Sequence, residues 1–338
     1  MLDFSNGHRS EEVDGEDHPD ESDEIEKEKT MHEKMYEIAT ARYNPFSLGG
    51  SENCDSDIDF VTEISRKEGF APGVGDLGIY QNTDKQGLWV GWLNGNPIGC
   101  IAGVRYNQDY GFLGLFLVIE KYRGRGFGVQ LWKKALSHLS DLPCVGLEAA
   151  PERIADYSKW GFTISSKTTR WQWLGDGKFL KDSCWHDDLD HFSFVEGSSI
   201  PQDAVEKFDE KRETTPRPHF LSNWLNHPAG KVIAVIDKEK QCHGFGRIRP
   251  CLLQNGDGWR IGPLMADTPD LLKILLKKLI ESHPGLVIID SPGLNKSASE
   301  VFENLGFKSE SETFRMYRGS QPPVSMSDVY GLACLELG

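Results

Sequence analysis

The sequence predicts an α+β fold of two domains, each a mixed, mostly antiparallel sheet flanked by helices. Hairpin turns at Asn94-Gly95 and 107–109 join three apolar runs, which is typical of antiparallel strands. Amphipathic stretches with helical spacing, such as 126–139, stand between such runs. The pattern also recurs, because ADYSKWGF (155–162) matches SEVFENLGF (299–307) and a strand precedes and follows each. We therefore expect an internal duplication of a unit of roughly 130–150 residues.

The first half begins with a segment, 31–43, that mixes helical and strand signals and stays open. Residues 55–70 predict a helix because Ile58, Val61 and Ile64 follow helical spacing. The Gly/Pro-rich residues 71–80 predict a loop. The remaining expected elements are strands at 87–93, 97–106 and 110–119, a helix at 126–139, a strand at 144–150, a helix at 151–161 and a strand at 162–173.

The second half repeats this rhythm. Thr268 followed by a proline is a typical helix start, so the apolar-periodic residues after it predict a strong helix. The expected elements are helices at 201–212 and 217–227, strands at 231–239, 242–250 and 259–267, a helix at 268–283, a strand at 286–292, a helix at 295–307 and a strand at 312–319.

Charge is unevenly spread along the 338 residues. Residues 1–30 hold twelve acidic and three basic side chains, which leaves −6 of the total net charge of −15 on the other 308 residues. A segment so charged and so poor in large hydrophobes predicts a disordered acidic tail. The expected division of the chain is a tail at 1–30, a first domain at 31–175, a linker at 176–190 and a second domain at 191–338.

Several classes of protein are disfavoured by composition. No basic block suggests a nucleic-acid partner, and no apolar run of eighteen residues suggests a membrane span. Seven scattered cysteines without C-x-x-C spacing argue against a zinc site or a disulfide framework. Without a signal peptide, a cytoplasmic location is expected. The oligomeric state stays open.

The most informative stretch is VIEKYRGRGFGVQLW, 118–132, where a glycine-rich turn joins a strand to a helix. The unpaired N–H groups of a helix N-terminus favour an anion, and glycines let the backbone approach it closely. The Rossmann spacing does not fit, because the third glycine falls one position early, and the Walker A Gly-Lys-Ser/Thr is absent. The spacing that fits is Arg123-x-x-Gly126-x-Gly128.

This stretch resembles the acetyl-CoA-binding motif of the GNAT superfamily of N-acetyltransferases. Residues 155–162 resemble that family's next motif, in which a tyrosine, here Tyr157, stands shortly before Gly-Phe. The two motifs occur in the right order, with strand 144–150 between them. The layout of 70–319 resembles tandem GNAT proteins, in which a full domain precedes a degenerate second copy. The resemblance thus implies two GNAT-like domains.

The resemblance also implies roles for individual residues. Backbone N–H groups of the turn would bind the pyrophosphate of CoA, and the preceding strand would pair with the pantetheine arm in a slot that a bulge opens. Tyr157 would protonate the leaving thiolate, although it could instead only pack against Phe162. The residues expected to bind acetyl-CoA are Phe116, Leu117, Val118, Arg123, Gly124, Arg125, Gly126, Phe127 and Gly128.

A group that removes the proton of the acceptor amine is harder to assign. Glu148, at the end of the strand beside the slot, is the first candidate, and it could equally be a solvated strand end or cap the helix at 151–153. Glu120 is the second candidate and Asp76 the third. The family's usual asparagine before the next helix is missing, since Ala150 and Pro151 stand there.

The second copy lacks the glycine turn and has Phe302 where Tyr157 stands. We expect it not to turn over acetyl-CoA, and either to wall the acceptor pocket or only to stabilise the first domain. Its polar residues near strand ends, including Arg249 and Asp290, are expected to form surface pairs. The predicted function is direct transfer of an acetyl group from acetyl-CoA to a primary amine of a small molecule. The alternative is an inactive acyl-CoA sensor or interaction protein.

Overall fold

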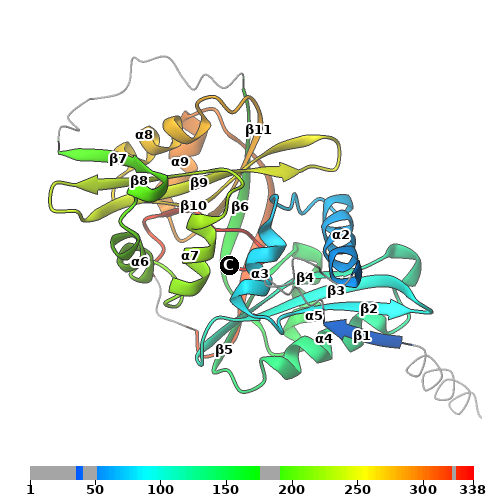
Figure 1. Ribbon diagram of the computed structural model, residues 1–338. Coiled ribbons are helices and arrows are strands. Elements are labelled where there is room, and N and C mark those ends of the chain that lie inside the picture. The colour runs from blue at the N-terminus through cyan, green and yellow to red at the C-terminus, as the bar shows by residue number, and fades with distance from the viewer. Residues whose placement is uncertain (1–35, 41–51, 176–190, 322–324) are drawn as a thin grey trace, which may run out of the picture.

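The computed structural model describes residues 36–40, 52–175, 191–321 and 325–338. Within these residues thirteen strands form one continuous sheet, which runs β1-β2-β3-β4-β5-β12-β6-β11-β10-β9-β8-β7, with β13 paired to β10. Helices pack on the sheet in both halves of the molecule (Figure 1). The expected tail at 1–30 and linker at 176–190 lie outside the described residues.

The half that contains the N-terminal strands is called the first lobe here. Its elements follow the predicted order closely, including the three hairpin strands. They are β1 (Tyr36–Thr40), α2 (Glu52–Lys67), α3 (Asp76–Thr83), β2 (Leu88–Leu93), β3 (Asn96–Arg105), β4 (Tyr110–Val118), η1 (Glu120–Tyr122), α4 (Phe127–His138), β5 (Cys144–Ala149), η2 (Pro151–Arg153), α5 (Ile154–Ser158) and β6 (Thr163–Gly175).

The other half, from residue 191 onward, is the second lobe. Its helices and strands also follow the predicted order, and α8 begins after Thr268 as predicted. The elements are β7 (Phe192–Glu196), η4 (Gly197–Ser199), α6 (Gln202–Glu210), α7 (Pro218–Asn226), β8 (Lys231–Asp237), β9 (Cys242–Leu252), β10 (Asp257–Ala266), α8 (Pro269–Ile280), β11 (Gly285–Pro292), α9 (Lys296–Asn304), β12 (Lys308–Gly319) and β13 (Val329–Gly331).

The two lobes exchange their closing strands. β12, the closing strand of the second lobe, pairs antiparallel with β5 of the first, from Phe314 opposite Ala149 to Gly319 opposite Cys144. β6, the closing strand of the first lobe, pairs antiparallel with β11 of the second. Because β12 and β6 also pair with each other, the sheet crosses the junction without a break. The separation of two domains near 176–190 stays a prediction.

Each lobe packs apolar side chains on both faces of its part of the sheet. In α4, Phe127, Leu131 and Ala135 lie on one face and are buried against the sheet, as their spacing predicted. The opposite face of the first lobe is covered by α2 and α3. In the second lobe α8 buries six aliphatic side chains against the sheet. Burial of a Leu or Ile side chain typically contributes about 1.5–3 kcal/mol, so α4 and α8 anchor the two lobes.

The expectation of a loop at 71–80 is wrong in part, because α3 begins at Asp76. Gly75 precedes the helix with a φ of 83°, and the Asp76 side chain accepts a hydrogen bond from the Gly73 amide at 3.1 Å. Leu77, Ile79 and Tyr80 are buried. Glycines in 71–80 disfavour a helix in isolation, and tertiary packing overrides that propensity here.

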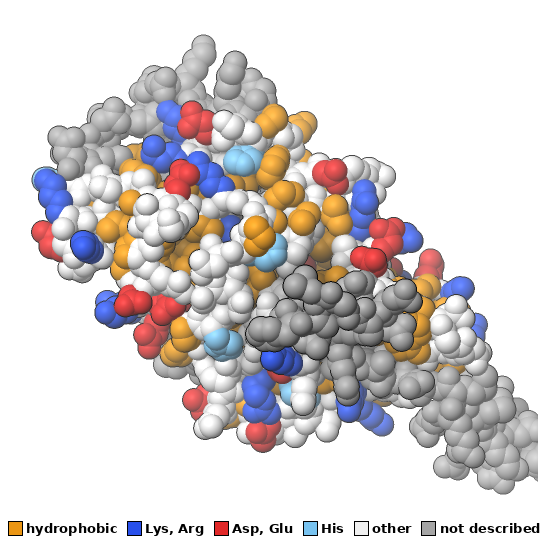
Figure 2. Space-filling view, viewed as in Figure 1, with side chains coloured by type: hydrophobic (Ala, Val, Ile, Leu, Met, Phe, Trp, Pro, Cys, Tyr) orange, Lys and Arg blue, Asp and Glu red, His pale blue; other side chains and the backbone are white. Residues whose placement is uncertain are grey.

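Charged side chains of both signs are interspersed on the face drawn in Figure 2. In the part of the chain that the structure describes, no helix combines the length and apolar character needed to cross a membrane. The expectation that neither nucleic acid nor a membrane is a partner stays a prediction.

Candidate active site

A bulge in β4 opens the sheet of the first lobe. β4 pairs parallel with β5 only from Tyr110 to Leu113. Its register with β3 then shifts, and Leu115 adopts a left-handed backbone with a φ of 49°. Extra residues in one strand bend it away from its neighbour. Within the described residues, the stretch 114–118 therefore has no strand partner on the side of β5, so backbone groups face an open slot.

The turn after β4 presents the N-terminus of α4. Gly124 and Gly126 have φ values of 75° and 82°, in the left-handed region that glycine tolerates best. Among the described residues no side chain caps α4, so the first N–H groups of the helix are left for another acceptor. Arg123 fixes the turn, because its Nε donates to the Val118 carbonyl at 2.8 Å and its guanidinium pairs with Glu68. The geometry suits a phosphate.

Replacing Gly126 by Ala tests this turn. A Cβ at Gly126 would meet no atom of the described residues within 4 Å, so its cost comes from the left-handed backbone, about 1–2 kcal/mol. If the strain displaces the turn, CoA should bind about 5–30-fold more weakly by calorimetry. Gly95→Ala is a matched control, since Gly95 also has an open surrounding and a φ of 75° but lies in a hairpin turn. It should lower stability similarly and leave CoA affinity unchanged; equal loss of affinity in both variants would contradict the assignment.

The slot and the turn belong to one cavity of about 590 Å³. Of the residues predicted from sequence, eight line it together, and Arg125, Gly126 and Phe127 lie beside it in the turn and helix start. The eight are Phe116, Leu117, Val118, Arg123, Gly124, Gly128, Glu148 and Tyr157.

Tyr157 comes from α5, and its ring packs against Trp132 of α4 with centroids 5.2 Å apart. Burial raises the pKa of the Tyr157 phenol to about 12. The hydroxyl therefore stays protonated throughout the neutral range. Tyr157 lines the cavity, so a proton donor is available there.

The side chain of Glu148 is buried, at 3% exposure, and extensively bonded. Its Oε1 accepts from Arg315 Nε at 2.6 Å and from Thr168 at 3.0 Å, and its Oε2 accepts from Thr313 at 2.9 Å. Arg315 and Thr313 belong to β12, the exchanged strand, so the second lobe supplies two of the three donors. One of these donors would have to be shared or released for Glu148 to receive a substrate proton.

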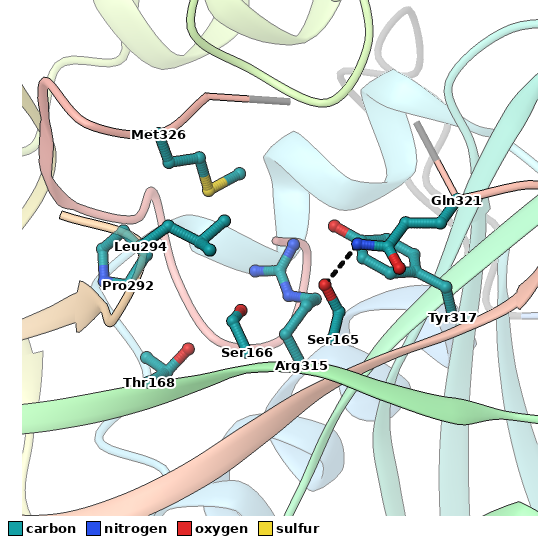
Figure 3. A pocket seen from close by; sticks show the side chains of 9 residues that line it. All are labelled: Ser165, Ser166, Thr168, Pro292, Leu294, Arg315, Tyr317, Gln321 and Met326. Carbon is teal, nitrogen blue, oxygen red and sulfur yellow. Dashed lines mark hydrogen bonds between the residues drawn. The ribbon is translucent and has the colours of Figure 1, made fainter. Parts of the chain in front are cut away.

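Arg315 also borders a second, much smaller cavity. Figure 3 shows its guanidinium rising from β12 between Tyr317 on one side and Ser166 and Thr168 on the other. Arg315 is 4% exposed, and its Nη2 has no hydrogen-bond partner among the described residues. The space of about 10 Å³ is roughly that of one water molecule. Arg315 therefore stands between this small cavity and the carboxylate of Glu148.

The other two candidate bases lie away from the cavity lining. Glu120 begins the short helix η1. Asp76 is 2% exposed and accepts two hydrogen bonds of 2.8 Å from Arg249 of β9. The structure instead brings in Glu336, which the sequence analysis missed. Only the long-range packing of the C-terminal segment against β4 reveals it, and no local pattern could have done so.

The equivalent slot of the second lobe is filled by the chain itself. β10 pairs parallel with β11 only from Trp259 to Ile261, and β13 then pairs with β10 at Leu264 and Met265. The N-terminus of α8 is capped, since the Thr268 side chain accepts from the Leu271 amide at 3.2 Å. These features agree with the expectation that the second lobe does not turn over acetyl-CoA, which stays a prediction.

Comparison with known proteins gives matches over both lobes. A model of the acetyltransferase (GNAT) family matches residues 58–162, and an acetyltransferase (GNAT) domain model matches 205–331. The holothin acyltransferase of Pseudoalteromonas sp. (strain SANK 73390) is 31% identical over 280 residues, 82% of this chain and 90% of the relative.

Solved structures share the fold. A Pyrococcus horikoshii protein assigned to the acetyltransferases aligns with a TM-score of 0.70 and 21% identity, over 90% of this chain and 96% of its own. A tandem GNAT protein from the clavulanic acid biosynthesis pathway aligns with a TM-score of 0.57 and 15% identity, over 83% of this chain and 98% of its own. Both likenesses concern the fold alone.

Proposed function

We propose that this chain, which belongs to the GNAT superfamily of acyltransferases as a tandem of two domains, moves an acetyl group from acetyl-CoA to a primary amine of a small molecule. Its family uses acyl-CoA donors, and acetyl-CoA is our choice among them. One observation carries the proposal. An unpaired strand segment, an uncapped helix N-terminus and a protonated tyrosine line or border the same cavity.

The donor binds along this cavity in our proposal. The pyrophosphate accepts hydrogen bonds from backbone N–H groups at the turn Arg123–Gly128. The pantetheine amides pair with the free edge of Phe116–Val118, as an added strand would. The bulge at Leu115 then marks the inner end of the slot, where the thioester carbonyl lies within reach of an acceptor.

The chemistry is a direct transfer. The amine nitrogen attacks the thioester carbonyl carbon, the carbon–sulfur bond breaks, and the leaving sulfur takes the Tyr157 proton. Tyr157 later regains a proton from solvent, and the amine proton passes to a base. A general acid of this kind typically accelerates such a step about 10²–10⁴-fold.

The acceptor amine must also lose a proton before it can attack. An alkylamine with a pKa of about 10.4 is neutral in only about one molecule in 2,500 at pH 7, which corresponds to about 4.6 kcal/mol. We propose Glu148 as the proton acceptor, directly or through water. The donors Thr168 and Thr313 are hydroxyls that can rotate, so either can exchange its bond to Glu148 for one to water.

Glu148→Gln tests this role. We expect kcat/KM for the amine to fall about 10²-fold at pH 7. It should recover as the pH approaches the pKa of the free amine, because a neutral amine needs no base. The readout is the pH profile at saturating acetyl-CoA. An unaltered profile would move the base elsewhere, and an equal loss at every pH would indicate a structural role beside Arg315.

The reaction itself is tested by release of free thiol. The purified chain is incubated with acetyl-CoA and longer acyl-CoAs, together with polyamines, amino acids, arylalkylamines and peptides. Holothin joins the panel because the Pseudoalteromonas relative is named for it. Thiol release with a small amine and acetyl-CoA supports the proposal. Binding of CoA without thiol release across the panel would favour a sensor.

A further inference from the structure

The C-terminal segment 328–338 runs between the two lobes, where Figure 1 marks the C-terminus. It first fills the slot of the second lobe as β13, and the Leu332 amide then donates to the Asp290 carbonyl at 2.8 Å. Arg249 donates to the Ala333 carbonyl at 3.1 Å, and the Tyr106 hydroxyl donates to the Leu337 carbonyl at 2.9 Å. Groups from both lobes therefore fix the path of this segment.

The segment then packs against β4 at the bulge. A Cβ on Gly114 would lie 1.9 Å from the Glu336 carbonyl oxygen, so only glycine permits this approach. In the second lobe, a Cβ on Gly262 would likewise lie 2.0 Å from the Leu332 carbonyl oxygen. The packing at Gly114 places Glu336 in the lining of the catalytic cavity.

The Glu336 carboxylate is buried but weakly bonded. It is 3% exposed, and its partner Arg260 approaches its two oxygens at 3.2 and 3.5 Å. The same guanidinium makes a shorter bond of 2.7 Å to Asp290. A carboxylate offers about four acceptor positions, so about two of those on Glu336 are not used by Arg260. Arg260 pairs with the Glu336 carboxylate, but both of its bonds are long, so a further donor from the cavity would stabilise this buried charge.

The other acids that line the cavity are differently placed. Glu148 accepts three hydrogen bonds, Glu68 pairs with Arg123, and Asp156 is half-exposed and pairs with Arg153 and Lys159. Glu152 is exposed. Among the described residues of the lining, Glu336 and Glu148 are the acids with buried side chains, and Glu336 accepts fewer hydrogen bonds, two against three.

We propose that Glu336 binds the amino group of the acceptor as an ammonium ion and so selects cationic alkylamines over neutral molecules of the same shape. An ammonium carries three donors and a positive charge, which the open positions of Glu336 can accept. The inference rests on the proposed function, since it names the group that recognises the acceptor. The proposal also gives the second lobe a role. Segment 328–338, which fills the slot of the second lobe, places Glu336 in the cavity of the first lobe.

The test compares two ligands that differ in charge, 2-phenylethylamine and 2-phenylethanol. CoA-saturated protein is titrated with each by calorimetry at pH 7. We expect the amine to bind at least about ten-fold more tightly than the alcohol to the unmodified chain, and this ratio to fall to about two-fold or less in Glu336→Gln. Glu300→Gln, the same change on the exposed side of α9, should keep the full ratio.

An equal ratio in the unmodified chain and in a folded Glu336→Gln would overturn the inference. If the Gln variant does not fold, Glu148→Gln decides, because it removes the other buried carboxylate of the lining: a full ratio in that variant supports Glu336, and a ratio of about two-fold or less overturns the proposal. Thiol release is measured separately. If no amine gives thiol release, acyl transfer is refuted. If thiol is released but the amine and the alcohol bind equally well, only the role of Glu336 is refuted.

Discussion

Tyr157→Phe should lower turnover at saturating acetyl-CoA by about 10²-fold or more, with the affinity for CoA unchanged. The ring would still pack against Trp132, so the change removes the hydroxyl and little else. The thiolate would then have to leave without a proton from the enzyme. The effect belongs in kcat rather than KM, because the proton is needed only as the carbon–sulfur bond breaks.

The pH profile gives a second check on Tyr157. Because burial raises its pKa to about 12, the phenol stays protonated up to about pH 11, and no loss of turnover below that pH should come from its ionisation. Tyr330→Phe, which removes a buried phenol hydroxyl from the second lobe, is the matched control and should leave turnover intact. Turnover of Tyr157→Phe within two-fold of the unmodified chain would exclude the acid role.

Local patterns predicted the strand, turn and helix around the proposed donor site well. The turn and α4 depend on glycines, on helical spacing and on a strand that ends where the turn begins, and all three lie within 110–138. Tyr157 follows from the family motif, and the structure places it in the same cavity. These features are encoded by residues that are close together in the sequence.

The surroundings of the residues proposed to contact the acceptor could not be predicted in the same way. Glu148 was expected beside the slot, but its donors Arg315 and Thr313 come from a strand that sequence alone assigned to the other domain. Glu336 reaches the cavity only because Gly114 admits the C-terminal segment. Strand exchange joins residues far apart in the chain, and propensity and periodicity carry no information about such pairs.

The expectation of surface pairs at Arg249 and Asp290 was wrong for the same reason. Both are buried, at 0% and 1% exposure, because the sheet continues from one lobe into the other. A strand end that would face solvent in a separate domain instead lies inside the junction. Polar residues at strand ends of a duplicated fold are therefore ambiguous until the pairing of the two copies is known.

Asp290→Ala should destabilise the fold by about 3–5 kcal/mol, because it leaves buried guanidinium groups without their main partner. Asp290 accepts from Arg170 Nε at 2.7 Å and Nη2 at 3.0 Å, and from Arg260 Nη2 at 2.7 Å. Arg170 belongs to β6, the closing strand of the first lobe, and Arg260 belongs to β10 of the second. The loss should appear as a lower free energy of unfolding in urea at pH 7, and Asp270→Ala, which removes an exposed carboxylate from α8, should cost less than about 1 kcal/mol.

At low pH, the difference in unfolding free energy between the unmodified chain and Asp290→Ala should become smaller. Burial alone would raise the pKa of Asp290, but the charges and hydrogen bonds of Arg170 and Arg260 lower it to about 2. A carboxyl whose pKa is lower in the folded chain adds stability that is complete above its unfolded pKa of about 3.9 and is lost as the pH falls through the folded value. The unmodified chain should thus lose about 2 kcal/mol relative to Asp290→Ala between pH 5 and pH 2. A constant difference over that range would show that Asp290 stabilises the junction by packing rather than by charge.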